Sequence, residues 1–328
     1  MKKINLIARD NGFGLSRDLR LLASALAASG HEVGICAVRR GKLRKLGNTL
    51  HVNARGALRR LRGRNAHEFD ANLMLEHVRP EYFPLARRNV LLPNPEWFLP
   101  SDQAVLGGID QVFAKTQYTQ EIFSALGCRV AFTGFTSGDR NDATVLRERA
   151  FFHLAGRSGT KNTEALLALW LQHPNWPRLT VVQDRHMAQA SIVAPNIDHR
   201  ITHLPDDELR RLQNSHRFHL CPSQTEGFGH YLVEALSVGA LTLTLDAAPM
   251  NELVTPERGV LVPVARTGMQ YLAATNFFDD AAMASRIEQV IGLSDAELER
   301  LGSAARAWFL DNDRAFRERL ASAIQALG

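Results

Sequence analysis

The sequence predicts an α/β protein of two Rossmann-like, doubly wound domains that face each other across a cleft. Its 328 residues suit two domains, and apolar strand patterns alternate with helical patterns in two successive series. The polar segment 137–148, with Gly138, Asp139, Asn141 and Asp142, separates the two series and is the expected link. Because ligands of such sheets bind beyond the carboxyl ends of the strands, the expected site lies in the cleft.

The first domain, expected over residues 1–145, begins with a βαβ unit. An apolar strand at 4–8 leads through a turn containing Gly12 and Gly14 to a helix at 16–28, with Ser16 as its N-cap. Gly30 closes this helix and a strand at 33–38 follows, so the sheet should be parallel. Further strands are predicted at 71–75, 90–92, 112–114 and 130–132, and a helix capped by Thr116 at 116–126.

The second domain, expected over residues 146–310, repeats this alternation. Strands are predicted at 151–155, 179–182, 218–221, 241–245 and 260–262, and helices at 206–213 and 231–238. Ser294 and Glu297 have the spacing of a capping box that opens a late helix. A C-terminal helix at about residues 311–328 is expected to pack back on the first domain.

The composition is that of an ordinary globular protein, with 45% hydrophobic, 22% charged and 7% aromatic residues. No apolar run approaches the ~18 residues that span a bilayer, and Asn5 and Arg9 interrupt the first apolar run before it could form a signal peptide's core. Cys36, Cys128 and Cys221 lie far apart, which argues against a disulfide framework or a zinc ribbon. These features predict a cytoplasmic protein.

Positive charge is concentrated in the first half of the chain. Residues 1–150 hold 23 Lys and Arg against 14 Asp and Glu, whereas residues 151–328 hold 16 against 20. The segment 39–64 has ten basic residues, no acidic residue and no aromatic residue, and the lack of stacking side chains argues against nucleic-acid binding. It is either a solvated face or a surface for anionic lipid headgroups or an anionic acceptor, which would place the protein peripherally at the inner face of the cytoplasmic membrane.

The segment 221–254, CPSQTEGFGHYLVEALSVGALTLTLDAAPMNELV, has the features of an anion site. Gly227 and Gly229 let backbone amides approach a ligand, and the following helix offers its N-terminal N–H groups, an arrangement that suits a diphosphate. Glu226 and Glu234 could accept hydrogen bonds from sugar and ribose hydroxyls, as acidic residues do in dinucleotide sites. The plainer alternative is that Glu226 caps the helix and Glu234 is an exposed helix residue.

The stretch EGFGHYLVE, residues 226–234, resembles the E-x7-E signature of retaining glycosyltransferases with the GT-B fold, specifically family 4, which use nucleotide-diphosphate sugars. Pro222, Ser223 and the later MNEL occur in the family's order. The resemblance implies that Glu226 contacts the donor sugar and Glu234 the nucleotide ribose. It also implies that Ser223 and the backbone of Gly227, Phe228 and Gly229 lie at the donor.

Upstream, HLAGRSGTKNTE at residues 153–164 resembles the family segment in which an Arg and a Lys neutralise the leaving diphosphate. The resemblance gives these roles to Arg157 and Lys161, without a divalent ion. Departure of a nucleoside diphosphate requires fixed positive charge where negative charge develops. The alternative is that both are solvated loop cations.

In the first domain the resemblance places His77, in LMLEHVRP, near the anomeric carbon of the donor. Glu76 and Glu96 are further candidates for the cleft. Gly12 and Gly14 belong either to a plain βα turn or to a loop that covers the diphosphate. The histidines show no zinc pattern, and His199 and His203 span a predicted strand, so no metal site is expected.

The predicted function is transfer of a sugar from a nucleotide-diphosphate sugar to a glycan or lipid-linked acceptor, with retention at the anomeric carbon, as in polysaccharide biosynthesis. No cofactor beyond the donor substrate is expected, and no nucleic-acid partner. The alternatives are a nucleotide-sugar epimerase or phosphorylase of the same fold, or a catalytically silent nucleotide-sugar-binding subunit of a glycan-assembly complex. A dinucleotide dehydrogenase is disfavoured because G-x-G-x-x-G follows neither first strand.

Overall fold

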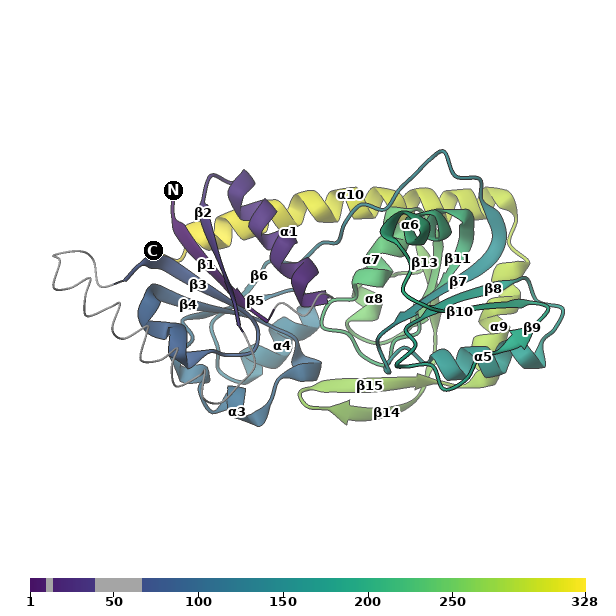
Figure 1. Cartoon of the computed structure of the whole chain (residues 1–328), viewed down its shortest axis with the longest axis horizontal. Coiled ribbons are helices and arrows are strands. Elements are labelled where there is room, and N and C mark those ends of the chain that lie inside the picture. The colour runs from purple at the N-terminus through teal and green to yellow at the C-terminus, as the bar shows by residue number, and fades with distance from the viewer. Residues whose placement is uncertain (10–13, 39–66) are drawn as a thin grey trace. The chain divides into compact units, whose positions relative to one another are not determined.

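The computed structural model describes residues 1–9, 14–38 and 67–328, which form two compact units (Figure 1). Unit 1 comprises Met1–Thr136 and Arg314–Gly328, and unit 2 comprises Ser137–Asp313. The chain therefore enters unit 2 at the start of the polar segment 137–148. Gly12 and the basic segment 39–64 lie outside the described residues.

Within its described part, unit 1 is built on a six-stranded sheet in the order β2-β1-β3-β4-β5-β6. Every pairing is parallel, as predicted. The strands are β1 (Lys3–Ala8), β2 (Glu32–Ala37), β3 (Phe69–Glu76), β4 (Ala86–Pro93), β5 (Gln111–Ala114) and β6 (Val130–Phe132). The helices are α1 (Gly14–Ala28), α3 (Pro100–Gln103) and α4 (Gln117–Ala125), with 3-10 turns at Pro80–Leu85, Pro95–Trp97 and Leu106–Gly108.

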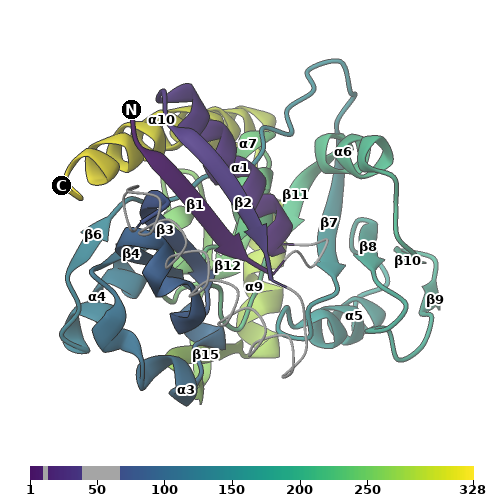
Figure 2. The ribbon, with the colours of Figure 1, turned by 60° about the vertical axis from the view of Figure 1, so that its left-hand side comes forward.

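Helix α1 packs beside β1 and β2, as Figure 2 shows. Its apolar residues recur at helical spacing, so Leu15, Leu19, Leu22 and Leu26 are all buried on one face. The prediction that Ser16 caps this helix is wrong, because the helix already begins at Gly14. Burial of Leu15 one turn before Leu19 explains the earlier start.

A row of buried amides crosses the centre of the unit 1 sheet. Asn5, Asn72 and Asn89 are aligned in register on β1, β3 and β4. Asn5 Nδ2 donates to Asn72 Oδ1 at 2.9 Å, and Asn72 Nδ2 donates to Asn89 Oδ1 and to the Tyr82 carbonyl, both at 2.8 Å. A slip of one residue would leave these groups unpaired in an apolar sheet, so the row specifies the register.

The end of the chain completes unit 1. Phe316 packs edge-on against Phe135, with ring centroids 5.0 Å apart, and Lys2 Nζ donates to the Ile324 carbonyl at 2.8 Å. Both termini therefore lie in this unit, close together (Figures 1 and 2). The expected separate helix at 311–328 is instead the second part of α10 (Asp295–Gln325), 31 residues long. No Gly or Pro interrupts the chain between Gly302 and Gly328, so nothing divides this helix.

Unit 2 is built on a seven-stranded sheet in the order β13-β12-β11-β7-β8-β10-β9, in which only the β9–β10 pairing is antiparallel within the described chain. Its strands are β7 (Glu148–Gly156), β8 (Leu179–Gln183), β9 (Val193–Ala194), β10 (Ile197–Ile201), β11 (His216–Leu220), β12 (Leu241–Leu245) and β13 (Gly259–Val262). The helices are α5 (Thr163–Gln172), α6 (Asp206–Ser215), α7 (His230–Ser237), α8 (Met250–Leu253), α9 (Asp280–Ile291) and the first part of α10.

Two details of unit 2 bear on the sequence prediction. The capping box at the start of α10 is confirmed, since Ser294 N donates to Glu297 Oε2 at 3.0 Å and Glu297 N donates to Ser294 Oγ at 3.3 Å. The hairpin of β14 (Val264–Gln270) and β15 (Ala273–Phe278) was not expected. Asn276 on β15 donates its backbone N–H to the Gln224 carbonyl at 2.8 Å, so the hairpin supports the loop after β11.

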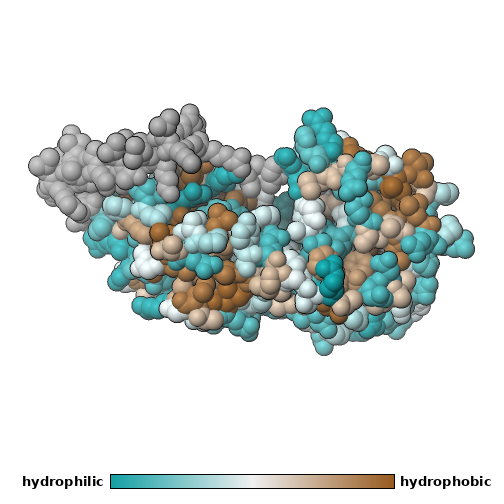
Figure 3. All heavy atoms as spheres, turned by 90° about the horizontal axis from the view of Figure 1, so that it is seen from below, coloured by the Kyte–Doolittle hydropathy of each residue, from teal (hydrophilic) through white to brown (hydrophobic). Residues whose placement is uncertain are grey.

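The surface in Figure 3 carries separate hydrophobic patches among hydrophilic residues. Exposed apolar side chains include Trp97 in unit 1 and Met269 in unit 2. Among the described helices, none has the length and apolar character that a membrane span requires.

Candidate functional site

The site predicted in the second series of elements lies where the strand order of unit 2 reverses. β7 is followed by β8 on one side, whereas β11 lies on the other side of β7. Such a switch point leaves room at the carboxyl ends of the two strands, because the connections leave in opposite directions. The loops 157–162 and 221–229 follow β7 and β11 and therefore meet at this edge.

Three hydrogen bonds join these two loops. Gln224 N donates to the Thr160 carbonyl at 2.7 Å, and Gln224 Nε2 donates to Asn162 Oδ1 at 2.9 Å. Asn162 Nδ2 donates to the Pro222 carbonyl, also at 2.9 Å. Asn162 has φ +54°, a left-handed backbone that Asn tolerates and that such close hydrogen bonding stabilises. The motif did not identify Asn162 or Gln224 as the residues that fix the loops.

Gly229 shapes the entry into α7. Its φ is +97°, and a Cβ atom there would lie 2.6 Å from Leu232 Cδ1 and 3.3 Å from Leu253 Cδ1. Only glycine fits this position without strain. The turn brings the buried Gly227 and Phe228 directly before the helix N-terminus, where N–H groups and the helix dipole favour an anion.

Glu226 is held by its neighbours rather than capping the helix. Ser223 Oγ donates to Glu226 Oε1 at 2.6 Å, and Ser223 also hydrogen-bonds the Tyr231 hydroxyl. The N-cap of α7 is Gly229, and no side chain makes a capping hydrogen bond there. The capping alternative for Glu226 is therefore wrong.

Lys161 and Arg157 extend from the loop after β7. Lys161 Nζ donates to the Leu154 carbonyl at 2.9 Å and lies 3.8 Å from the centroid of the Tyr231 ring. The side chain of Arg157 is half-exposed, and its Nε lies 3.6 Å from Asp184 Oδ2, just beyond β8. The structure thus places Lys161 against Tyr231, whose hydroxyl contacts Ser223, and directs Arg157 toward the neighbouring strand end.

Glu234 is 2% exposed, so the alternative that it is an exposed helix residue is wrong. Its Oε2 accepts a hydrogen bond from Gln213 Nε2 at 2.9 Å, and Ser137 Oγ lies 3.4 Å from its Oε1. Ser137 also hydrogen-bonds His230 Nδ1 at 3.1 Å. A carboxylate offers about four acceptor positions, so Glu234 has the capacity to accept from hydroxyl groups in addition to these two protein donors.

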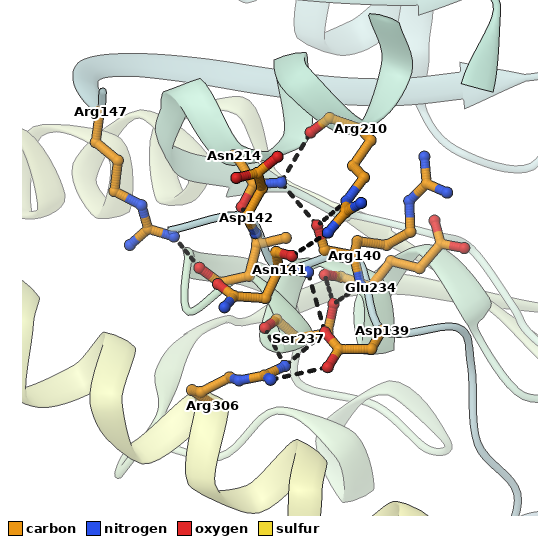
Figure 4. Close-up of polar contacts among 11 residues, drawn as sticks. Asp139, Arg140, Asn141, Asp142, Arg147, Arg210, Asn214, Glu234, Ser237 and Arg306 are labelled. Atoms are coloured by element: carbon orange, nitrogen blue, oxygen red, sulfur yellow. Dashed lines mark hydrogen bonds and ion pairs between the residues drawn. The ribbon is translucent and has the colours of Figure 1, made fainter. Parts of the chain in front are cut away.

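The polar segment next to Glu234 is anchored by arginines (Figure 4). Arg306 makes two hydrogen bonds with the Asp139 carboxylate, at 2.6 and 2.8 Å. Arg140 Nη1 pairs with both oxygens of Asp206, at 2.8 and 2.9 Å, and its Nε donates to Gln213 Oε1 at 2.7 Å. Gln213 therefore links Glu234 to this segment, which makes it a site residue that the sequence analysis missed.

Unit 1 holds the other candidate residues. His77 Nδ1 lies 2.8 Å from Asp102 Oδ2, and His77 Nε2 lies 3.4 Å from Glu76 Oε2. Glu76 ends β3 with φ +68°, and burial raises the pKa of its carboxyl, with the charge of His77 acting in the opposite direction. Asp102 also accepts from the backbone N–H of Val78 at 3.1 Å, so it fixes the turn that carries His77. No sequence signal marks Asp102, which lies on α3.

A buried ion pair lies at the same sheet edge of unit 1. Lys115 Nζ lies 2.6 Å from Asp18 Oδ2 and 2.9 Å from Asn94 Oδ1. Glu96 is buried in the 3-10 turn after β4. Gly14 is exposed at the start of α1, and a Cβ atom there would meet nothing within 4 Å, so space alone does not require glycine.

The described part of the chain contains no group of three or more His, Cys, Asp or Glu residues that could hold a metal ion. His199 lies on β10, where its Nε2 hydrogen-bonds Gln183 Oε1 at 2.9 Å, and His203 follows that strand.

Comparison with known proteins gives a family match over part of unit 2 and a fold match over both units. Residues 186–308 match the model of the family Glycosyl transferases group 1, a range that includes Glu226 and Glu234 but not Arg157 or Lys161. No curated protein matched the sequence.

Several solved structures are similar to the whole chain. Sucrose-phosphate synthase from Thermosynechococcus elongatus has a TM-score of 0.74 at 15% identity, covering 100% of this chain and 99% of its own. Anabaena Alr3699/HepE in complex with UDP and glucose has a TM-score of 0.68 at 14% identity, covering 99% of this chain and 100% of its own. The fold is GT-B. The lipopolysaccharide outer core galactosyltransferase WaaB, a further similar structure, has a TM-score of 0.67 at 13% identity, covering 99% of both chains.

The GT-B fold confirms the predicted fold class, and the group 1 match together with the fold supports a glycosyltransferase.

Proposed function

We propose that this protein is a retaining glycosyltransferase of the family 4 type, which transfers a sugar from a nucleotide-diphosphate sugar to a glycan or lipid-linked acceptor. The observation that carries the proposal is the chain of contacts at the switch point of unit 2 that links Glu226 through Ser223 and Tyr231 to Lys161. An acceptor for hydroxyl groups and a cation for phosphate are thus both held by the first turn of α7 and the loop before it.

In the proposed reaction the bond between the anomeric carbon and the diphosphate breaks while the acceptor hydroxyl attacks that carbon from the same face, and the proton of the hydroxyl passes to the departing phosphate oxygen. Arg157 and Lys161 stabilise the negative charge that develops on the diphosphate, which is where preorganised charge lowers a barrier most. Glu226 accepts hydrogen bonds from the sugar hydroxyls, and Glu234 accepts them from the ribose. No covalent enzyme intermediate and no metal ion take part in this proposal.

Unit 2 is the proposed donor-binding domain and unit 1 the proposed acceptor side. His77, oriented by Asp102, is the proposed group of unit 1 at the reaction centre. Gly14, at the start of α1, is proposed to lie near the diphosphate.

Two of the similar proteins suggest the substrates to test first. HepE was solved with UDP-glucose, which makes a uridine nucleotide the first donor to examine. WaaB is a galactosyltransferase of the lipopolysaccharide outer core, which favours a lipid-linked glycan as acceptor and a peripheral place at the membrane.

The test is a thermal-shift and calorimetric panel of UDP, GDP, ADP and their sugars, followed by turnover of the donor that binds. A ligand at 100 times its Kd stabilises by about 2.7 kcal/mol, which gives a clear shift. NMR of the product then reads the anomeric configuration. Binding of no nucleotide, or inversion of configuration, contradicts the proposal.

The second candidate is a catalytically silent binding subunit. The buried carboxylate of Glu234, held by Gln213 and Ser137, would serve nucleotide binding whether or not transfer follows. If the protein binds a nucleotide sugar but neither transfers the sugar nor slowly hydrolyses the donor, this function is favoured. Isomerisation of the sugar nucleotide would instead identify an epimerase.

A further inference from the structure

Tyr231 lies at the centre of the unit 2 site. It is 6% exposed on the first turn of α7, where its ring faces Lys161 and its hydroxyl meets Ser223. A single aromatic side chain therefore touches both the proposed diphosphate cation and the hydroxyl that holds Glu226.

The direction of the hydrogen bonds follows from the groups present. Ser223 Oγ donates its one hydrogen to Glu226 Oε1 at 2.6 Å, so it can only accept from the Tyr231 hydroxyl. Burial raises the pKa of Tyr231 well above its ordinary value, and the tyrosine keeps the hydrogen that it donates. The chain runs from Tyr231 through Ser223 to Glu226, and each bond polarises the next.

The other end of Tyr231 holds a cation. Lys161 Nζ lies 3.8 Å from the ring centroid, well within the range of a cation–π contact, and the Leu154 carbonyl accepts from it at 2.9 Å. A lysine stem is flexible and the ammonium is a point charge. The ring face and the carbonyl together restrict Nζ to one place.

We propose that Tyr231 is a positioning residue that sets Lys161 against the leaving diphosphate and Glu226 against the donor sugar, so that the two act as a unit. The inference rests on the proposed function. It assigns separate tasks to two parts of one side chain: the ring positions the cation, and the hydroxyl positions the carboxylate.

Two substitutions separate these tasks. Tyr231→Phe keeps the ring and removes the hydroxyl, whereas Tyr231→Leu removes both. Ser223→Ala breaks the same chain one step later. Tyr271→Phe is the matched control, since Tyr271 is 49% exposed in the turn between β14 and β15. Affinity for the nucleoside diphosphate found in the panel is measured by calorimetry, and kcat is measured with its sugar.

Tyr231→Phe should lower kcat about tenfold, the scale of one lost hydrogen bond, and leave the Kd of the diphosphate within about twofold. Tyr231→Leu should also raise that Kd about tenfold, because the ammonium group of Lys161 loses its contact with the aromatic ring. The ring in Tyr231→Phe thus rescues diphosphate affinity. Ser223→Ala should match Tyr231→Phe in kcat, and the double variant should be no slower than either.

The outcomes distinguish the inference from the function on which it rests. A parent protein that binds no nucleoside diphosphate overturns both. A parent that binds and turns over, with Tyr231→Phe indistinguishable from Tyr271→Phe, overturns the inference alone. Equal Kd losses in Tyr231→Phe and Tyr231→Leu, or additive effects of Ser223→Ala and Tyr231→Phe, also overturn it. Thermal unfolding of each variant shows whether a loss reflects the site or the fold.

Discussion

Glu226 and Glu234 stand in one short signature but in different surroundings. Glu226 accepts from Ser223, whose hydroxyl also contacts Tyr231, whereas Glu234 is buried against Gln213. Glu226→Gln should therefore slow turnover and leave nucleoside diphosphate binding nearly intact. Glu234→Ala should weaken the nucleotide by ~1 to 3 kcal/mol, the scale of a hydrogen bond to a charged group. Calorimetry and kcat measured on both variants check this, and equal losses of binding would contradict the assignment.

Arg157 and Lys161 are expected to act without a metal ion. Replacing either with Ala should reduce transfer ~10²-fold to 10³-fold, because a preorganised charge is lost where the leaving group becomes anionic. Arg178→Ala is the control, since Arg178 pairs with Glu148 on the surface of the same unit, at 2.6 Å. If a chelator abolishes transfer by the parent while both variants stay active, a metal ion neutralises the diphosphate instead.

The amide row of Asn5, Asn72 and Asn89 leads to a prediction about how strand pairing contributes to stability. Asn72→Ala removes the middle side chain of the row. The Asn5 amide, the Asn89 oxygen and the Tyr82 carbonyl then each lose the hydrogen bond that Asn72 makes with them. Each buried polar group without a partner costs ~1 to 3 kcal/mol. Urea unfolding should therefore show a loss of at least about 2 kcal/mol. A loss below 0.5 kcal/mol, the ordinary range of surface substitutions, would show that the row does not specify the register.

The elements that were predicted well are those whose own residues show a strand pattern or a helix cap. The buried strand β12, LTLTL, alternates Leu with β-branched Thr, which is a strand pattern, and Thr116 caps α4 as expected, with its Oγ1 accepting from Thr119 N at 3.1 Å. The β14–β15 hairpin and the unbroken α10 were missed. Hairpin residues such as Arg266 and Met269 are exposed and alternate weakly. The sequence did not predict that α10 is continuous, because its first part packs in unit 2 and its second part in unit 1.

The residues of the candidate site also fall into two groups, those that a local motif identifies and those that it does not. The motif pointed to Glu226 and to Gly229, whose positive φ a local pattern can reveal. Tyr231, Asp102 and Gln213 owe their roles to contacts between segments distant in the chain, such as the pairing of Asp102 with His77. No spacing within one segment contains that information.

Three buried histidines, all in unit 2, make the stability of that unit depend on acid pH. Burial lowers the pKa of His153 to about 4, that of His219 to about 3, and that of His216 in the same direction. The folded protein keeps them neutral, while the unfolded chain binds protons below the ordinary value of 6.5. Stability is thus complete above that pH and is lost as the pH falls below it, toward the folded pKa values.

From pH 7.5 to pH 5 the free energy of unfolding should fall by about 2 kcal/mol for each of His153 and His219, with His216 adding to the fall. Urea unfolding at the two pH values measures the fall. His219→Asn should reduce it, and His203→Asn, at an exposed position, should not. A free energy that stays constant over this interval would contradict the assignment of neutral, buried rings.

The charge asymmetry of the chain leads to a prediction about surfaces. If the basic segment 39–64 faces anionic lipid, binding to anionic vesicles should fall steeply with salt, since charges more than ~8 Å apart are screened at physiological ionic strength. Replacing Arg59, Arg60, Arg62 and Arg64 with Gln should remove most of the binding without changing the nucleotide-induced shift. Binding that is independent of salt, or a quadruple variant that binds like the parent, excludes the membrane role.

The division of α10 between the units has a consequence for synthesis on the ribosome. Unit 2 is a single stretch, Ser137–Asp313, but unit 1 needs residues 314–328, which are synthesised after all of unit 2. Nascent chains fold from the N-terminus onward, so the surfaces of unit 1 that bury Phe316, Leu320 and Ile324 stay uncovered until this segment has left the ribosome. The unit that is begun first is therefore completed after unit 2, and a chain cut short near residue 310 should aggregate although unit 2 is nearly complete.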